Sequence, residues 1–165
     1  MRINRVVTRV GDGGSTQLVG GSMVSKGSLR VQACGDVDEL NCALGLAASL
    51  LEDRQILEPL HRIQNELFTV GADLASPMNV TVPRVAPEHV AGLEAMLDSF
   101  MDELPPLEEF VLPGGGPGGA ALHVARAVAR RAERSVVALA AQDYVNLQAQ
   151  IYLNRLSDLL FVMAR

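Results

Sequence analysis

The chain has 165 residues, of which 48 % are hydrophobic and 4 % aromatic, and it carries a formal net charge of −5. This length and composition indicate one domain, residues 1–165, with a sizeable core, and the few aromatic residues favour packed helices over a β-sandwich or barrel. The chain has neither an apolar run of about 20 residues nor a signal-peptide core, which excludes a membrane span and predicts a cytoplasmic protein.

The predicted elements begin with a glycine-rich, non-helical segment over residues 1–35. Asp36-x-x-Glu39 is typical of a capping box and predicts a helix that starts at Asp36 and runs to about Leu51. Apolar residues at helical spacing predict four further helices, over residues 55–74, 87–104, 118–141 and 146–165. We therefore expect an all-α fold, an up-and-down five-helix bundle over residues 36–165 preceded by a glycine-rich loop.

Charge is distributed unevenly along these elements. Residues 1–31 carry a net +4, residues 32–116 a net −12, and residues 117–165 a net +3. The basic excess is small and is not interleaved with aromatic residues, which argues against nucleic acid as a partner. A compact anion held between the two basic ends fits the pattern better.

The segment TRVGDGGSTQL (Thr8 to Leu18) combines glycines, hydroxyls and an acid in one loop. Its glycines allow successive backbone N–H groups to converge on a phosphate, and Asp12 could hold Mg²⁺ against phosphate oxygens. The spacing matches neither a Walker A loop nor a Rossmann fingerprint. A merely flexible N-terminus is the alternative interpretation. Lys26 extends the basic segment, whereas we interpret Arg30 as a surface charge.

The segment HVARAVARRAER (His123 to Arg134) places four arginines and a glutamate within nine residues. At about 100° per residue, one helical face collects most of the polar side chains. These are His123, Arg126, Arg130, Glu133 and Arg134. Three guanidinium groups on one face repel each other unless an anion lies opposite, which favours a polyphosphate site. A solvated basic face is the alternative.

Four other positions allow both a structural and a functional interpretation. Asp38 could cap its helix or pair with an arginine of another helix. Phe110 could fill the core or form the wall of a pocket. Asn154, which shares one face of the last helix with Phe161, could hydrogen-bond a nucleotide or cap a neighbouring loop. The motif Glu58-x-x-His61 lacks the second half of a di-iron site, and Cys34 and Cys42 lack CxxC spacing, so we expect no protein-held metal.

Taken together and in order, these motifs resemble the PduO-type ATP:cob(I)alamin adenosyltransferases. The matching stretches are TRVGDGGSTQL, Lys26 with GDVDELN, FVLPGGG, LHVARAVARRAER and YLNRLSDLLFVMAR. The resemblance implies a homotrimeric five-helix bundle with each active site between neighbouring subunits. ATP would be held by the N-terminal loop of one subunit and the arginine helix of the other.

The resemblance also implies roles for individual residues. ATP would be bound in the N-terminal segment by Thr8, Arg9, Val10, Gly11, Asp12, Gly14, Thr16, Gln17 and Lys26. The remainder of the ATP site would comprise Arg130, Glu133, Arg134 and Asn154, with Arg131 nearby. Asp38 would pair with Arg126 across the subunit interface. Phe110 would press on the lower face of the corrinoid and displace its axial ligand, and Phe161 is a second candidate for that pocket.

The implied reaction needs no protein nucleophile, because Co(I) itself attacks C5′ of ATP and expels triphosphate. The protein would position ATP, Mg²⁺ and cobalamin and stabilise charge on the leaving group. A flavoprotein-type reductant and an adenosylcobalamin-dependent enzyme are the further partners that the resemblance allows. An ATP-gated carrier or sensor of adenosylcobalamin with little turnover is the alternative function, and a helical interaction module is the third.

Overall fold

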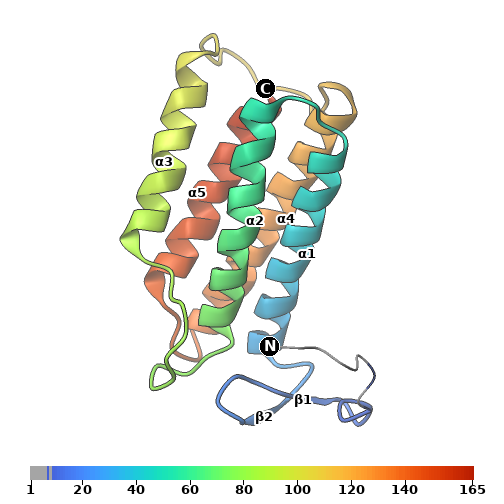
Figure 1. The fold of residues 1–165 in the computed structure, drawn as a ribbon, viewed down its shortest axis with the longest axis vertical. Helices are drawn as coiled ribbons and strands as arrows, with labels where there is room; N and C mark the ends of the chain where they lie inside the picture. The colour runs from blue at the N-terminus through green and yellow to red at the C-terminus, as the bar shows by residue number, and fades with distance from the viewer. Residues whose placement is uncertain (1–6, 8) are drawn as a thin grey trace.

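The structure, a computed structural model, describes residue 7 and residues 9–165. Five helices run alternately up and down, which confirms the predicted all-α bundle (Figure 1). They are α1 (Leu29–Ser49), α2 (Arg54–Leu74), α3 (Pro87–Asp102), α4 (Gly116–Ala140) and α5 (Leu147–Ala164). None of the helices in the described part of the chain combines the length and apolar character that a membrane span needs.

Helix α4 lies at the centre of the packing. It packs against α1 on one side and against α5 on the other, while α2 lies on α1 and α3 on α5. The core comes from the apolar faces that helical spacing predicted, among them Leu40, Leu44, Leu60, Ile63 and Leu67, all of them buried. Because both neighbours of α4 cover its alanine-rich face, its arginines are confined to the remaining surface of the helix.

The predicted start of the first helix is wrong. Helix α1 begins at Leu29, where the Ser28 hydroxyl caps the helix by accepting from Val31 N at 3.4 Å. Gly35 lies inside the helix, where glycine costs only about 1 kcal/mol relative to alanine. Asp36 is therefore not an N-cap, and its carboxylate instead accepts a hydrogen bond from Ser135 on α4. The other four helices begin and end within two residues of expectation.

The described residues before α1 form a small hairpin below the first turn of that helix (Figure 1). Strand β1 (Ser15–Gln17) pairs antiparallel with β2 (Met23–Ser25), with Thr16 opposite Val24. The non-helical character predicted for residues 1–35 is thus confirmed for the described residues up to Ser28 and wrong for residues 29–35.

Candidate active site

The glycine-rich loop closes on itself at the base of the hairpin. Lys26 N donates to Gly14 O at 2.9 Å, and Gly14 has a φ of +80°, which favours glycine at this turn. A Cβ on Gly11 would lie 2.9 Å from Lys26 Nζ, so the ammonium group lies directly over that glycine. The loop thus brings a flexible cation onto backbone that a phosphate could approach closely.

A depression of about 590 Å³ lies on this loop. It is lined by Val7, Arg9, Val10, Gly11, Asp12, Ser15, Thr16, Gln17 and Lys26. Gly14 shapes the turn without lining the depression, and Thr8 lies outside the described residues. The structure therefore brings most of the candidate residues of the N-terminal segment together on one surface.

The arginine face of α4 presents its cations outward. Arg130 and Arg134 are exposed, whereas Arg126 is half-buried with its Cζ 5.8 Å from the centre of the Phe161 ring. Over residue 7 and residues 9–165, no carboxylate lies within 4.0 Å of the guanidinium nitrogens of these three arginines. Arg126 Nε is buried and has no hydrogen-bond partner among the described residues.

Arg131 differs from the other arginines of α4. It turns toward α1, where its guanidinium pairs with Glu39 and, at 3.5 Å, with Asp36. Asp36 also accepts from Ser135, so these polar contacts join α1 and α4. Within one chain, Arg131 thus holds two helices together instead of facing the same surface as Arg130.

Glu133 and Asn154 meet across the junction of α4 and α5. Asn154 Nδ2 donates to Glu133 Oε1 at 2.9 Å, and both side chains are half-buried. The family resemblance implied one site for both residues, and the structure brings them into direct contact. The carboxylate therefore fixes the orientation of the amide, leaving the amide oxygen available to a ligand.

A cavity of about 1040 Å³ lies between α3, α5 and the connection from α3 to α4. Its apolar lining includes Phe110, Phe161 and Met101, and Arg126 and Arg130 reach it from α4. Phe110 is fully exposed, so its interpretation as a core residue is wrong and its interpretation as a pocket wall fits. A flat apolar ligand beside an anion would match this lining.

His123 lies behind the wall of this cavity. Its ring centre is 6.2 Å from that of Phe161, and its Nδ1 is buried with no partner among the described residues. Burial lowers the pKa of the His123 imidazole, and the charge of Arg126 lowers it further. A neutral imidazole avoids repulsion with Arg126 and supports the position of the Phe161 ring.

Two of the implied pairings do not form within one chain. Asp38 lies in an exposed groove between α1 and α2, with Cys42, His61 and Phe68 among its neighbours, whereas Arg126 lines the large cavity. The N-terminal depression and the arginine face likewise line separate hollows. Each half of the candidate site is present, and a single chain does not join them.

Other arginines have contacts that the sequence did not predict. Arg155 lines the large cavity, held by Glu94 at 2.8 Å and by Asp158 at 3.3 Å. Its signal was the spacing of Arg155 and Asp158, three apart on one helix. Arg30, interpreted as a surface charge, is only 16 % exposed and donates to the carbonyl oxygens of Leu74 and Tyr144. No local pattern reveals such long-range contacts.

A model of the cobalamin adenosyltransferase family matches residues 6–165 of this chain. The chain belongs to that family. It is 46 % identical over 175 residues to a corrinoid adenosyltransferase from Mycobacterium leprae, covering all of this chain and 92 % of that one. The corrinoid adenosyltransferase PduO of Citrobacter freundii is 42 % identical over 163 residues, covering 97 % of this chain and 49 % of that one.

Solved structures of the family resemble this fold closely. A variant PduO-type ATP:corrinoid adenosyltransferase from Lactobacillus reuteri, complexed with cobalamin and ATP, has a TM-score of 0.93 and 36 % identity. The match covers 98 % of this chain and 92 % of that chain. A second variant from the same organism, complexed with ATP, has a TM-score of 0.91 and 37 % identity, covering 97 % of this chain and 92 % of that one.

Proposed function

We propose that this cobalamin adenosyltransferase transfers the 5′-deoxyadenosyl group of ATP to cob(I)alamin, forming adenosylcobalamin and releasing triphosphate. The observation that carries the proposal is the cavity in which Phe110 and Phe161 lie beside Arg126 and Arg130. Its apolar wall suits the corrin ring, and its guanidinium groups suit the nucleotide. The complexes of the Lactobacillus reuteri relatives with cobalamin and ATP support the same pair of substrates.

The active site would be shared by two subunits of a homotrimer. The N-terminal loop of one subunit, with Lys26 and Asp12, would face Arg130 and Arg134 of its neighbour. The separation of these two surfaces within one chain supports this arrangement. Outward-facing arginines without carboxylate partners among the described residues would find their anion in the triphosphate.

Asp38 would meet Arg126 at the same interface. Its groove between α1 and α2 exposes Phe68, an aromatic side chain that a neighbouring subunit would cover. A carboxylate from that subunit would satisfy the buried Nε of Arg126, which lacks a partner among the described residues. Glu133 and Asn154 would complete the ATP site, with Arg131 nearby, where it pairs with Glu39 and Asp36 of α1.

In this reaction the substrates exchange the electrons, and the protein would position the substrates and stabilise charge. The Co(I) electron pair forms a bond to C5′, and the electrons of the C5′–O5′ bond leave with the triphosphate. Arg130 and Lys26 would stabilise the charge that develops on that leaving group. No three His, Cys, Asp or Glu side chains converge among the described residues, so Mg²⁺ would be held mainly by phosphate oxygens, with Asp12 nearby.

Phe110 would act on the corrinoid rather than on ATP. Its fully exposed ring lies on the wall of the cavity and could press against the lower face of the corrin. Displacing the axial ligand there would make Co(II) easier to reduce to Co(I).

The proposed setting is the cytoplasm, where Cys34 and Cys42 would stay reduced. A flavoprotein-type reductant would supply electrons to cobalt, and an adenosylcobalamin-dependent enzyme would receive the product. An anaerobic assay with ATP and chemically reduced cobalamin tests the reaction, with the Co–C bond followed by absorbance. We expect turnover with release of triphosphate. Tight binding of both ligands without a Co–C bond would indicate a carrier instead.

A further inference from the structure

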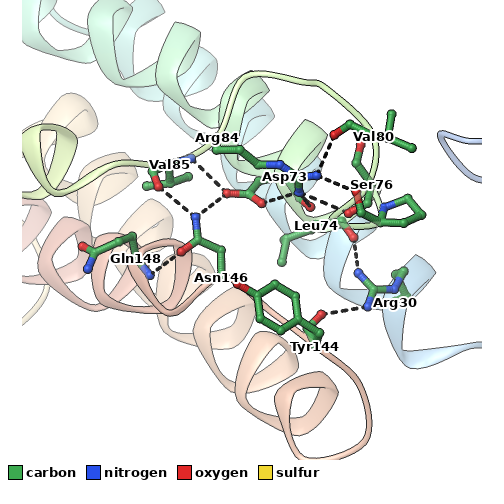
Figure 2. A network of polar contacts seen from close by, with 11 residues as sticks. Arg30, Asp73, Leu74, Ser76, Val80, Arg84, Val85, Tyr144, Asn146 and Gln148 are labelled. Carbon is green, nitrogen blue, oxygen red and sulfur yellow. Dashed lines mark hydrogen bonds and ion pairs between the residues drawn. The ribbon is translucent and has the colours of Figure 1, made fainter.

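A single guanidinium group organises the connection between α2 and α3. Arg84 Nη1 donates to Asp73 O and Ser76 O, both at 3.1 Å, and pairs with Asp73 Oδ1 at 2.8 Å. Arg84 Nη2 donates to Pro77 O at 2.6 Å and to Val80 O at 3.1 Å (Figure 2). Because the guanidinium group is planar and rigid, these contacts fix the path of residues 76–80.

Asp73 ties this connection to the bundle. Asp73 is 4 % exposed, and its carboxylate accepts from Val85 N at 2.9 Å and from Asn146 Nδ2 at 2.7 Å. Asn146 in turn caps α5 through Gln148 N at 3.1 Å and donates to Val85 O at 2.8 Å (Figure 2). The connection is thus fastened at once to the end of α2 and to the start of α5.

The turn of the hairpin rests on this fastened connection. Gly20 lies in the turn between β1 and β2 with a φ of +92°. A Cβ added to Gly20 would lie 3.3 Å from Val80 Cγ2 and 3.6 Å from Pro77 Cδ, so the turn backbone lies close to both side chains and leaves little room for a side chain at position 20. The two residues that support the turn are therefore the two whose carbonyl groups Arg84 Nη2 holds.

Next to this contact, a cavity of about 560 Å³ lies between the hairpin and the bundle. The hairpin contributes Leu18, Ser22 and Val24 to its lining, and the connection between α2 and α3 contributes Ser76, Pro77 and Met78. Because this cavity separates the rest of the hairpin from the bundle, the described residues of the hairpin approach the connection closely only at the Gly20 turn. A small change in the path of residues 76–80 would alter the tilt of the hairpin, and with it the loop at its base.

We propose that Arg84 is a positioning residue for ATP, acting through Pro77, Val80 and the hairpin turn on the glycine-rich loop. The proposal rests on the role assigned above to that loop in ATP binding. Arg84 itself would touch neither substrate. Without its contacts the loop would sample more conformations, and ATP would have to order the loop on binding, which weakens affinity. The corrinoid cavity has none of these residues in its lining and would be unaffected.

The test compares Arg84→Lys, Arg84→Ala and Val80→Ala by steady-state kinetics. Lysine keeps the charge beside Asp73 but loses the planar fork, and Val80→Ala keeps the carbonyl group while removing the methyl groups against Gly20. We expect the KM for ATP to rise about tenfold in Arg84→Ala and less in the other two. The KM for cob(I)alamin and the kcat at saturating ATP should stay within about twofold of the original chain.

Two control variants separate the alternatives. Arg62→Ala removes an arginine that pairs with Glu66 within α2 and should leave both KM values unchanged. Lys26→Ala tests the loop itself. A raised KM for ATP in Lys26→Ala but not in the Arg84 variants would overturn the positioning role alone, whereas an unchanged value in Lys26→Ala would overturn the proposed ATP loop.

Thermal denaturation supplies the remaining readout. A purely structural role for Arg84 predicts a lower Tm with an unchanged KM for ATP, or an equal rise in both KM values, and either result would overturn the proposal. If Arg84→Ala does not fold, Arg84→Lys and Val80→Ala decide in the same way. A rise confined to the KM for ATP in both variants supports it.

Discussion

The arginines at the hairpin end of the bundle and those on α4 differ in what they contact. At the hairpin end of the bundle, Arg30 and Arg84 are largely covered, and each donates to backbone carbonyl groups of its own chain (Figure 2). Each also pairs with one acid, Arg30 with Asp143 and Arg84 with Asp73. On α4, Arg130 and Arg134 are exposed, and no ion pair of theirs occurs within the described ranges. A cation that already has its partners stabilises the fold, whereas a cation directed outward is available to a ligand.

The largest loss of stability is expected where a covered arginine loses its buried acid. Asp73→Ala removes a buried carboxylate that accepts from Arg84, Val85 and Asn146. Because breaking a buried pair leaves its partner uncompensated, we expect a loss of about 3–5 kcal/mol in the free energy of unfolding. Urea denaturation followed by circular dichroism measures it. The matched control, Asp102→Ala at an exposed helix end, should stay within about 0.5 kcal/mol of the original chain. Equal stability of the two variants would contradict the structural role of this network.

On the ligand side, Arg130→Ala should leave stability unchanged and damage catalysis. An oriented guanidinium at a developing negative charge is worth roughly 2–4 kcal/mol, so kcat/KM should fall by about 30-fold to 10³-fold. Anaerobic assays with pre-reduced cobalamin at varied ATP concentration measure the loss. A near-normal rate would indicate that the arginine face is an ordinary solvated surface and would contradict its role in binding a ligand.

Phe110→Ala should impair the reaction of the corrinoid without weakening the binding of ATP. We expect ATP affinity to stay within about twofold of the original chain. The reaction that starts from Co(II) and a reductant should slow more than the reaction that starts from Co(I). Parallel assays from the two cobalt states give the ratio. Equal slowing in both assays would remove the role in displacing the axial ligand.

The helices could be predicted from the sequence because apolar spacing depends only on local geometry. Leu60, Ile63 and Leu67 are buried as that spacing requires. The start of α1 could not, since Gly35 and Asp36 imitate a helix boundary while Ser28 provides the cap that forms. Local sequence signals for caps compete with tertiary contacts, here the hydrogen bond from Ser135 to Asp36.

The candidate site could be predicted only in part from the sequence, because some of its contacts join residues far apart in the chain. Arg130 stood out because several arginines share one helical face, and Phe110 stood out because it lies in the motif FVLPGGG of the resembling family. Arg30 and Arg84 did not, because their partners, such as Tyr144 and Asp73, are distant or unremarkable in sequence. The contact of Asn154 with Glu133 depends on how α4 and α5 pack, which no local pattern encodes.

The central claim is that the loop of one subunit and the arginine face of another form one site. Its most direct test is co-expression of two differently tagged variants, Asp12→Ala in the loop and Arg130→Ala on α4, each of which we expect to lose most of its activity when expressed alone. If sites form between subunits, random trimers of equal amounts regain about a quarter of the original activity, because one site in four pairs an intact loop with an intact arginine. Activity in the purified mixed trimers no greater than that of the two separate variants would contradict the account.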